Sequence, residues 1–143
     1  MVAFNGLGIV VTTPDGWEDI SDLEGGLPPF LTLCKADGYG ALQFSEGPAD
    51  LNIPSTSQSL ADWLCANHCP ERWGPALESM TEDTPMMLAA ATFKYDGEPM
   101  RIWALSNGSR SAIVHYTVEE NSFNPAELAE CEQIVRGIRF LPA

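Results

Sequence analysis

The second half of the chain contains three runs rich in hydrophobic residues that are typical of β-strands. The runs cover residues 86–95, 100–106 and 111–118. Asp96-Gly97 and Asn107-Gly108 lie between them, and both pairs favour tight hairpin turns because Gly tolerates a positive φ. We therefore predict an antiparallel meander of three strands.

The middle strand of this meander carries apolar side chains on both of its faces. A strand that alternates strictly buries one face, whereas apolar residues on both faces indicate a strand that is covered on both sides. In residues 100–106, one face holds Met100, Ile102 and Ala104, and the other holds Arg101, Trp103 and Leu105. We therefore expect packed elements on both sides of the sheet.

Shorter strands are predicted in the first half of the chain. Residues 8–13 form a β-branched run, and residues 30–34 and 41–45 predict a hairpin whose turn contains Asp37-Gly38. Residues 17–27 are acidic and end in glycines, so we expect mostly loop there. The early strands therefore add to the sheet formed by the meander.

The first predicted helix begins at Ser59 and stops before Pro70. Asp62 stands three residues after Ser59, so the two side chains suit a capping pair. A proline pushes the residue before it out of the α region, which ends the helix. The apolar stripe at i, i+3, i+4 spacing consists of Leu60, Trp63 and Leu64.

The last helix has the clearest boundaries. Asn124 suits the N-cap, Pro125 suits the first helical position, and Glu127 stands where a capping carboxylate is favoured. Acidic residues lie early in this helix and arginines late, which complements the helix dipole. The stripe that faces the sheet consists of Leu128, Cys131, Val135 and Ile138.

Length and composition fit one domain. The chain has 143 residues, of which 45% are hydrophobic and 19% charged, so a conventional core is expected without disulfides or metals. The predicted fold class is α+β, with residues 1–143 forming a single domain. We expect an antiparallel sheet of about five or six strands with two or more helices packed on it.

The net charge of −13 is the unusual quantity, with 20 acidic residues against 7 lysines and arginines. A field of this sign repels nucleic acids and anionic membranes and attracts basic protein partners. We therefore expect neither nucleic-acid nor membrane binding. The alternative is that the acidity serves solubility alone.

The chain begins without a basic segment or an apolar run of signal-peptide length, which predicts a cytoplasmic protein. Its four cysteines are then expected to be thiols. Cys65, His68 and Cys69 resemble part of a metal site, because Cys65 and Cys69 are four residues apart on the predicted first helix. A structural zinc site needs four ligands, and Cys34 or Cys131 would have to complete it. We expect no metal or cofactor.

Catalytic patterns are weak. His68 and His115 are the two histidines, and neither accompanies a Gly-x-Ser-x-Gly elbow or a recognisable motif around a nucleophilic cysteine. We therefore expect that the protein is not an enzyme. A small hydrolase that uses His68 or His115 remains an alternative.

Two acidic stretches are candidates for partner binding. The first interleaves carboxylates with apolar anchors, and the second lies beside several methionines, which adapt to irregular partner surfaces. The alternative is that the apolar residues are buried and the acids solvated. The candidate residues are Trp17, Glu18, Asp19, Asp22 and Glu24 in the first stretch, and Glu78, Glu82 and Asp83 in the second.

The order of elements resembles the PsbP-like α/β/α sandwich family. The resemblance rests on an early strand that ends in Pro14-Asp15-Gly16-Trp17, on the meander, and on a final helix that runs through Glu132-Gln133-Ile134-Val135-Arg136-Gly137-Ile138-Arg139-Phe140. It implies binding rather than catalysis, since bacterial relatives of this fold include immunity and adaptor proteins associated with toxins. No catalytic residues carry over.

The leading hypothesis is an immunity protein that neutralises a cognate basic toxin through an acidic surface. The alternative is a secretion adaptor or chaperone for an effector. An adaptor would need an exposed apolar groove, with Trp63, Trp73, Met86 or Met87 as the candidate lining.

Overall fold

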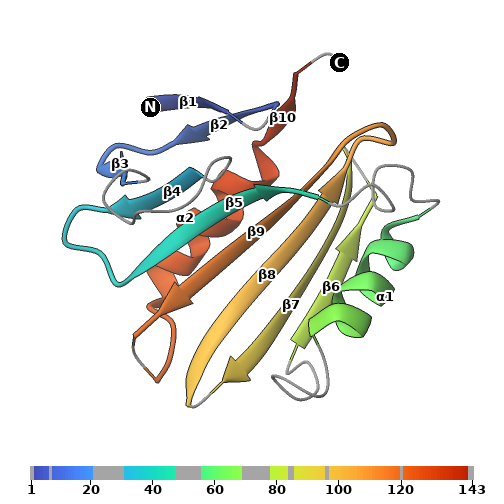
Figure 1. The fold of residues 1–143 in the computed structure, drawn as a ribbon. Coiled ribbons are helices and arrows are strands. Elements are labelled where there is room, and N and C mark those ends of the chain that lie inside the picture. Colours follow the sequence, from blue (N-terminus) through green and yellow to red (C-terminus); the bar gives the residue numbers. More distant parts are fainter. Residues whose placement is uncertain are drawn as a thin grey trace.

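The fold is taken from a computed structural model. It describes residues 2–6, 8–20, 31–47, 56–68, 78–83, 86–95, 97–119 and 121–141. Figure 1 shows these segments as a large curved sheet, a helix on each side of it and a small second sheet near the chain ends.

Seven strands form the large sheet, and every neighbouring pair in it is antiparallel. The chain is therefore α+β, as predicted. In spatial order the strands are β3 (Trp17–Asp19), β4 (Leu31–Lys35), β5 (Gly40–Glu46), β9 (Ser111–Val118), β8 (Glu98–Ser106), β7 (Met87–Tyr95) and β6 (Glu78–Glu82). The predicted meander forms one half of this sheet, and the predicted hairpin pairs with it through β5 and β9.

Both edge strands of the large sheet lie outside the predicted strands. β3 falls in the segment expected to be mostly loop, and its three residues pair with β4 from Trp17 opposite Lys35 to Asp19 opposite Leu33. β6 has the sequence ESMTE, which contains a single apolar residue. An edge strand needs few apolar residues because it pairs on one side only, so hydrophobic periodicity does not reveal it.

A second, three-stranded sheet lies beside the first. It contains β1 (Val2–Gly6), β2 (Ile9–Thr13) and β10 (Arg139–Phe140), with β2 in the middle. The strand predicted over residues 8–13 therefore exists but belongs to this sheet. Ile9 and Val11 are buried in the same core cluster as Ile138, so the small sheet closes the end of the main core.

The helices α1 (Ser57–His68) and α2 (Pro125–Arg136) cover opposite faces of the large sheet (Figure 1). Leu60 and Leu64 of α1 pack against Ile102, whereas Trp103 packs in the cluster that contains Cys131 of α2. Neighbouring residues of β8 therefore contribute to two different core clusters. The predicted two-sided burial of residues 100–106 is confirmed.

The helix boundaries follow side-chain capping. α1 starts at Ser57, two residues earlier than predicted, because Thr56 Oγ1 accepts a hydrogen bond from the Ser59 amide at 3.2 Å. The Asp62 carboxylate accepts a hydrogen bond from the side-chain amide of Gln58 at 3.0 Å instead of pairing with Ser59. At α2 the prediction holds, since Asn124 is the N-cap and its side chain accepts from the Glu127 amide at 3.0 Å.

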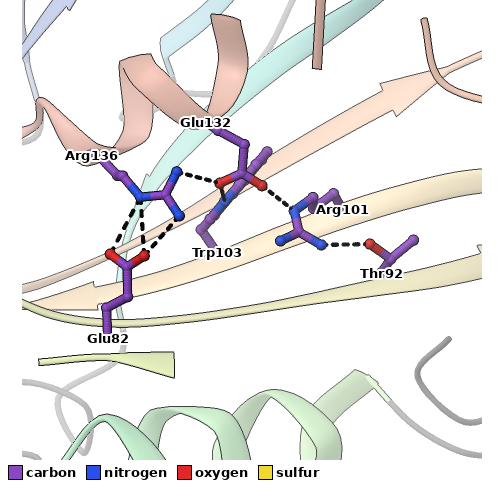
Figure 2. A network of polar contacts seen from close by, with 6 residues as sticks. All are labelled: Glu82, Thr92, Arg101, Trp103, Glu132 and Arg136. Carbon is purple, nitrogen blue, oxygen red and sulfur yellow. Dashed lines mark hydrogen bonds and ion pairs between the residues drawn. The ribbon is translucent and has the colours of Figure 1, made fainter. Parts of the chain in front are cut away.

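A polar network holds the C-terminal half of α2 on the sheet (Figure 2). Glu132 accepts hydrogen bonds from Arg101 Nε at 2.6 Å and from Trp103 Nε1 at 3.2 Å. Arg136 lies 3.4 Å from Glu132 and donates to Glu82 on β6 at 2.8 Å. The Arg101 side chain is only 6% exposed, so Glu132 neutralises a charge that water barely reaches.

Glu132→Ala is expected to lower the free energy of unfolding by about 3 kcal/mol, because it removes the carboxylate that binds the largely buried Arg101 guanidinium and the Trp103 indole. Glu82→Gln is the matched control, since its partner Arg136 is 43% exposed and a surface pair contributes less than about 1 kcal/mol. Urea denaturation of both variants measures the difference. Equal losses would contradict the assigned role of Glu132.

The Glu82–Arg136 pair also predicts a pH dependence. The hydrogen bond from Arg136 lowers the pKa of Glu82 below its ordinary value of 4.5. A carboxylate with a lowered folded pKa adds stability above its unfolded pKa and loses it as the pH falls through the folded pKa. The stability difference between wild type and Glu82→Gln should therefore be constant near neutral pH and shrink below about pH 4.5, as measured by urea denaturation. A difference that persists at pH 2 would contradict this.

Candidate partner-binding cleft

The first predicted acidic stretch is only partly on the surface. Trp17 is 3% exposed and packs in the main core, so the prediction that it anchors a partner is corrected. Its pairing with β4 turns the indole toward α2 and away from solvent. Glu18 and Asp19 are exposed on β3, while Asp22 and Glu24 lie outside the described residues.

The second predicted stretch lies at the opposite edge of the sheet, on and after β6. The Glu82 carboxylate is bound by Arg136, and the exposed Asp83 accepts a hydrogen bond from the amide of Ser57 at the start of α1. Only the backbone of Glu78 is described. The fold therefore separates the two predicted stretches and uses Glu82 and Asp83 in internal contacts.

The histidine and cysteine candidates do not come together in the described residues. His115 is half-buried on β9, opposite Gln43 and Ile102, and does not line the pockets found beside Met86, Tyr39 and Phe123. Neither Cys34 nor Cys131 forms a disulfide, and Cys131 belongs to α2, where it is buried against the face of the sheet opposite α1. Among the side chains that the structure describes, no group of three or more His, Cys, Asp or Glu residues could hold a metal ion. The side chains of Cys65 and His68 lie outside the described residues, as does Cys69.

The residues proposed for an apolar groove pack mainly against the core. Trp63 and Met87 contact the cluster under α1, and Met86 contacts the main cluster. Met86 also lines a pocket of about 470 Å³ at the end of α2, but this pocket contains Arg136 and Arg139. Trp73 lies outside the described residues.

A cleft opens on the sheet face opposite α2, where β5 begins and β9 ends. Cross-strand pairing aligns Glu18, Cys34, Ala41 and Thr117 in one row on this face. α1 packs on the neighbouring strands β6, β7 and β8. The cleft has a volume of about 480 Å³ and is lined by Cys34, Lys35, Asp37, Gly38, Tyr39, Gly40, Ala41, Glu98, Thr117, Val118 and Glu119. We call it the Tyr39 cleft.

The wall of the cleft is the loop between β4 and β5, and a buried carboxylate holds this loop in place. Glu127, in the first turn of α2, is 3% exposed. It accepts hydrogen bonds from the Tyr39 amide at 3.1 Å, from the Gly40 amide at 3.0 Å and from the Tyr116 hydroxyl. Burial, followed by this hydrogen bond to Glu127, raises the pKa of Tyr116, so its hydroxyl remains a donor.

Two glycines allow the loop to approach this carboxylate. A Cβ atom on Gly38 would stand 2.3 Å from Glu127 Oε1, and one on Gly40 would stand 2.3 Å from the Thr117 carbonyl oxygen. Any other residue would push the loop away from α2 or from β9. The pattern Gly38-Tyr39-Gly40 is therefore a structural requirement of the cleft wall.

The side chain of Tyr39 projects from this fixed loop into solvent. Its side chain is 53% exposed, and it lines both the Tyr39 cleft and a second pocket of about 300 Å³ near the start of α2. Phe123, which lines the second pocket, stacks on Tyr116 with ring centres 5.5 Å apart. The backbone of Tyr39 is thus fixed to the core while its ring faces solvent.

The charge of the cleft is negative. Asp37, Glu98 and Glu119 are exposed, and no described residue forms an ion pair with them. The cation at the wall, Lys35, is bound to Glu130 of α2 at 2.5 Å, and this hydrogen bond raises the pKa of Lys35. The sequence analysis missed these three carboxylates because they lie far apart in the chain and line one cleft only through the pairing of distant strands.

The fold is similar to that of a known protein. The solution structure of the cyanobacterial PsbP (CyanoP) from Synechocystis sp. PCC 6803 matches with a TM-score of 0.58, covering 93% of this chain and 86% of that chain. This is a PsbP-like fold. The two sequences are 12% identical, so the similarity concerns the fold alone. No protein-family model and no curated protein matches the chain in sequence. In the described ranges, no helix combines the length and apolar character needed to cross a membrane.

Gly40→Ala is expected to destabilise the protein by about 2 kcal/mol, because the added methyl group overlaps the Thr117 carbonyl and displaces the loop from Glu127. Gly137→Ala is the matched control, since its Cβ would meet no atom closer than 3.4 Å. Its free energy of unfolding should stay within about 0.5 kcal/mol of wild type. Thermal and urea denaturation check both values, and a neutral Gly40→Ala would contradict the close approach.

Proposed function

We propose that this chain is a non-enzymatic protein-binding module, an immunity protein that neutralises a cognate bacterial toxin through an acidic surface. The observation that carries the proposal is the Tyr39 cleft, where an exposed tyrosine on a fixed loop stands among carboxylates without internal cationic partners among the described residues. The net charge of −13 extends this negative field over the molecule. Tyrosine is a common anchor of protein interfaces, and charge complementarity selects a basic partner.

The physical basis of inhibition would be occlusion. A toxin that acts on an anionic substrate has a basic surface at its active site, and an acidic protein of complementary shape blocks that surface. Electrostatic steering raises association rates by about 10- to 1,000-fold. The PsbP-like fold supplies the scaffold, and the surface carries the function.

The first test is affinity capture from a lysate of the source organism at low and high salt. We expect one stoichiometric partner that is released at high salt, that is toxic when expressed alone and that becomes harmless when co-expressed with this protein. A salt-resistant partner bound through an apolar segment would instead favour a secretion adaptor. A partner that stays toxic on co-expression would contradict the immunity role.

Charge reversal then locates the surface. Glu98→Lys combined with Glu119→Lys is expected to slow association with the captured partner at least about tenfold, because it reverses the local field at the cleft. Glu46→Lys with Asp62→Lys changes the net charge equally at two exposed residues outside the cleft lining and should slow association by less than about threefold. Stopped-flow or surface-plasmon measurements at two salt concentrations give the rates. Equal slowing by the two variants would remove the cleft from the interface.

A further inference from the structure

The loop that carries Tyr39 is arranged in advance for binding. Glu127 fixes the backbone amides of Tyr39 and Gly40, and the Ala36 amide donates to the Gly16 carbonyl at 2.8 Å. The loop therefore loses little conformational entropy when a ligand contacts the Tyr39 ring, and such preorganisation raises affinity. A buried carboxylate is costly unless several donors satisfy it, so the loop conformation is strongly specified.

The charges around the ring select a cation. Asp37, Glu98 and Glu119 contribute three carboxylates, while the ammonium group of Lys35 is neutralised by Glu130. The face of an aromatic ring attracts a cation within about 6 Å of its centre. A guanidinium group is planar, is weakly hydrated, stacks on aromatic rings and binds carboxylates through two parallel hydrogen bonds.

The size of the cleft suits one or two side chains of a partner. Its volume of about 480 Å³ lies within the roughly 300–1,000 Å³ of small-ligand pockets. Thr117 also lines the cleft and adds a hydroxyl group to the three carboxylates. An extended arginine side chain would reach the carboxylates while its alkyl part covers Cys34 and Ala41.

We propose that the Tyr39 cleft receives an arginine side chain of the protein partner, stacked on Tyr39 and paired with the carboxylates of Glu98 and Glu119. This inference rests on the proposed function, since it names the chemical group that the acidic surface recognises.

The test uses a peptide probe with the full-length protein. Acetyl-Gly-Arg-Gly-amide is titrated into ¹⁵N-labelled protein, with the matched citrulline peptide as a neutral isosteric control. We expect saturable shifts of the Tyr39 and Gly40 amides with the arginine peptide and no saturable shift with citrulline. Equal binding of citrulline, shifts confined to other surfaces, or no saturable shift would overturn the proposal.

Variants locate the site. Glu98→Gln with Glu119→Gln should weaken the arginine peptide about tenfold, and Tyr39→Leu should weaken it about threefold. Glu46→Gln with Asp62→Gln should leave its affinity unchanged. The substituted side chains are exposed, so the variants are expected to fold, and their amide spectra verify this. Unchanged affinity in the first two variants would place the peptide elsewhere.

Measurements with the captured partner distinguish the proposal of arginine binding in the Tyr39 cleft from the proposal of an immunity role. If the partner binds and is neutralised but Tyr39→Leu and the Glu98/Glu119 variant leave its affinity unchanged, the cleft proposal fails and the immunity role stands. If the arginine peptide binds in the cleft but no toxin is captured, the cleft stands and the immunity role fails.

Discussion

The carboxylate of Glu127 joins three parts of the fold that are distant in sequence. Glu127 lies in the first turn of α2. Its carboxylate accepts hydrogen bonds from the hydroxyl of Tyr116 on β9 and from the backbone amides of Tyr39 and Gly40, where β5 begins. The positive end of the helix dipole lies at this turn and favours a negative charge there. Without this carboxylate the Tyr116 hydroxyl and both amides would lose their acceptor, and the β4–β5 loop would lose its attachment to the helix.

A second polar cluster attaches the C-terminal half of α2 to the sheet, as Glu127 attaches its first turn. Glu132 and Arg136 connect the helix to β8 and β6, so α2 is attached along its length to the same face of the sheet. Between the two polar sites, Cys131, Ile134 and Val135 fill the core. The helix therefore covers one face, while α1 packs on the other face over β6, β7 and β8. The position of the Tyr39 cleft follows from this unequal coverage.

The sequence predicted best those elements that are determined by residues close together in the chain. Hairpin dipeptides between hydrophobic runs predicted β7, β8 and β9, and the Asn124–Pro125 pair predicted the start of α2. Prediction failed where pairing partners are distant. Trp17, Glu18 and Asp19 form β3 only because they pair with β4, and residues 8–13 join the small sheet because β10 returns from the far end of the chain. Trp17 looked like a surface anchor because its neighbours are acidic, yet strand alternation turns it into the core.

The amino-acid sequence by itself determined the α+β class, the N-cap of the last helix and the strong negative charge, since each depends on composition or on residues a few positions apart. Tertiary structure decided which of the acidic residues share a surface. Glu127 looked like an ordinary capping residue, and only the packing of α2 against β9 made it the buried acceptor that holds Tyr39. Asp37, Glu98 and Glu119 lie in three separate segments, and the pairing of β4 with β5, β5 with β9 and β9 with β8 brings these segments to one cleft, because antiparallel pairing joins residues regardless of their distance along the chain.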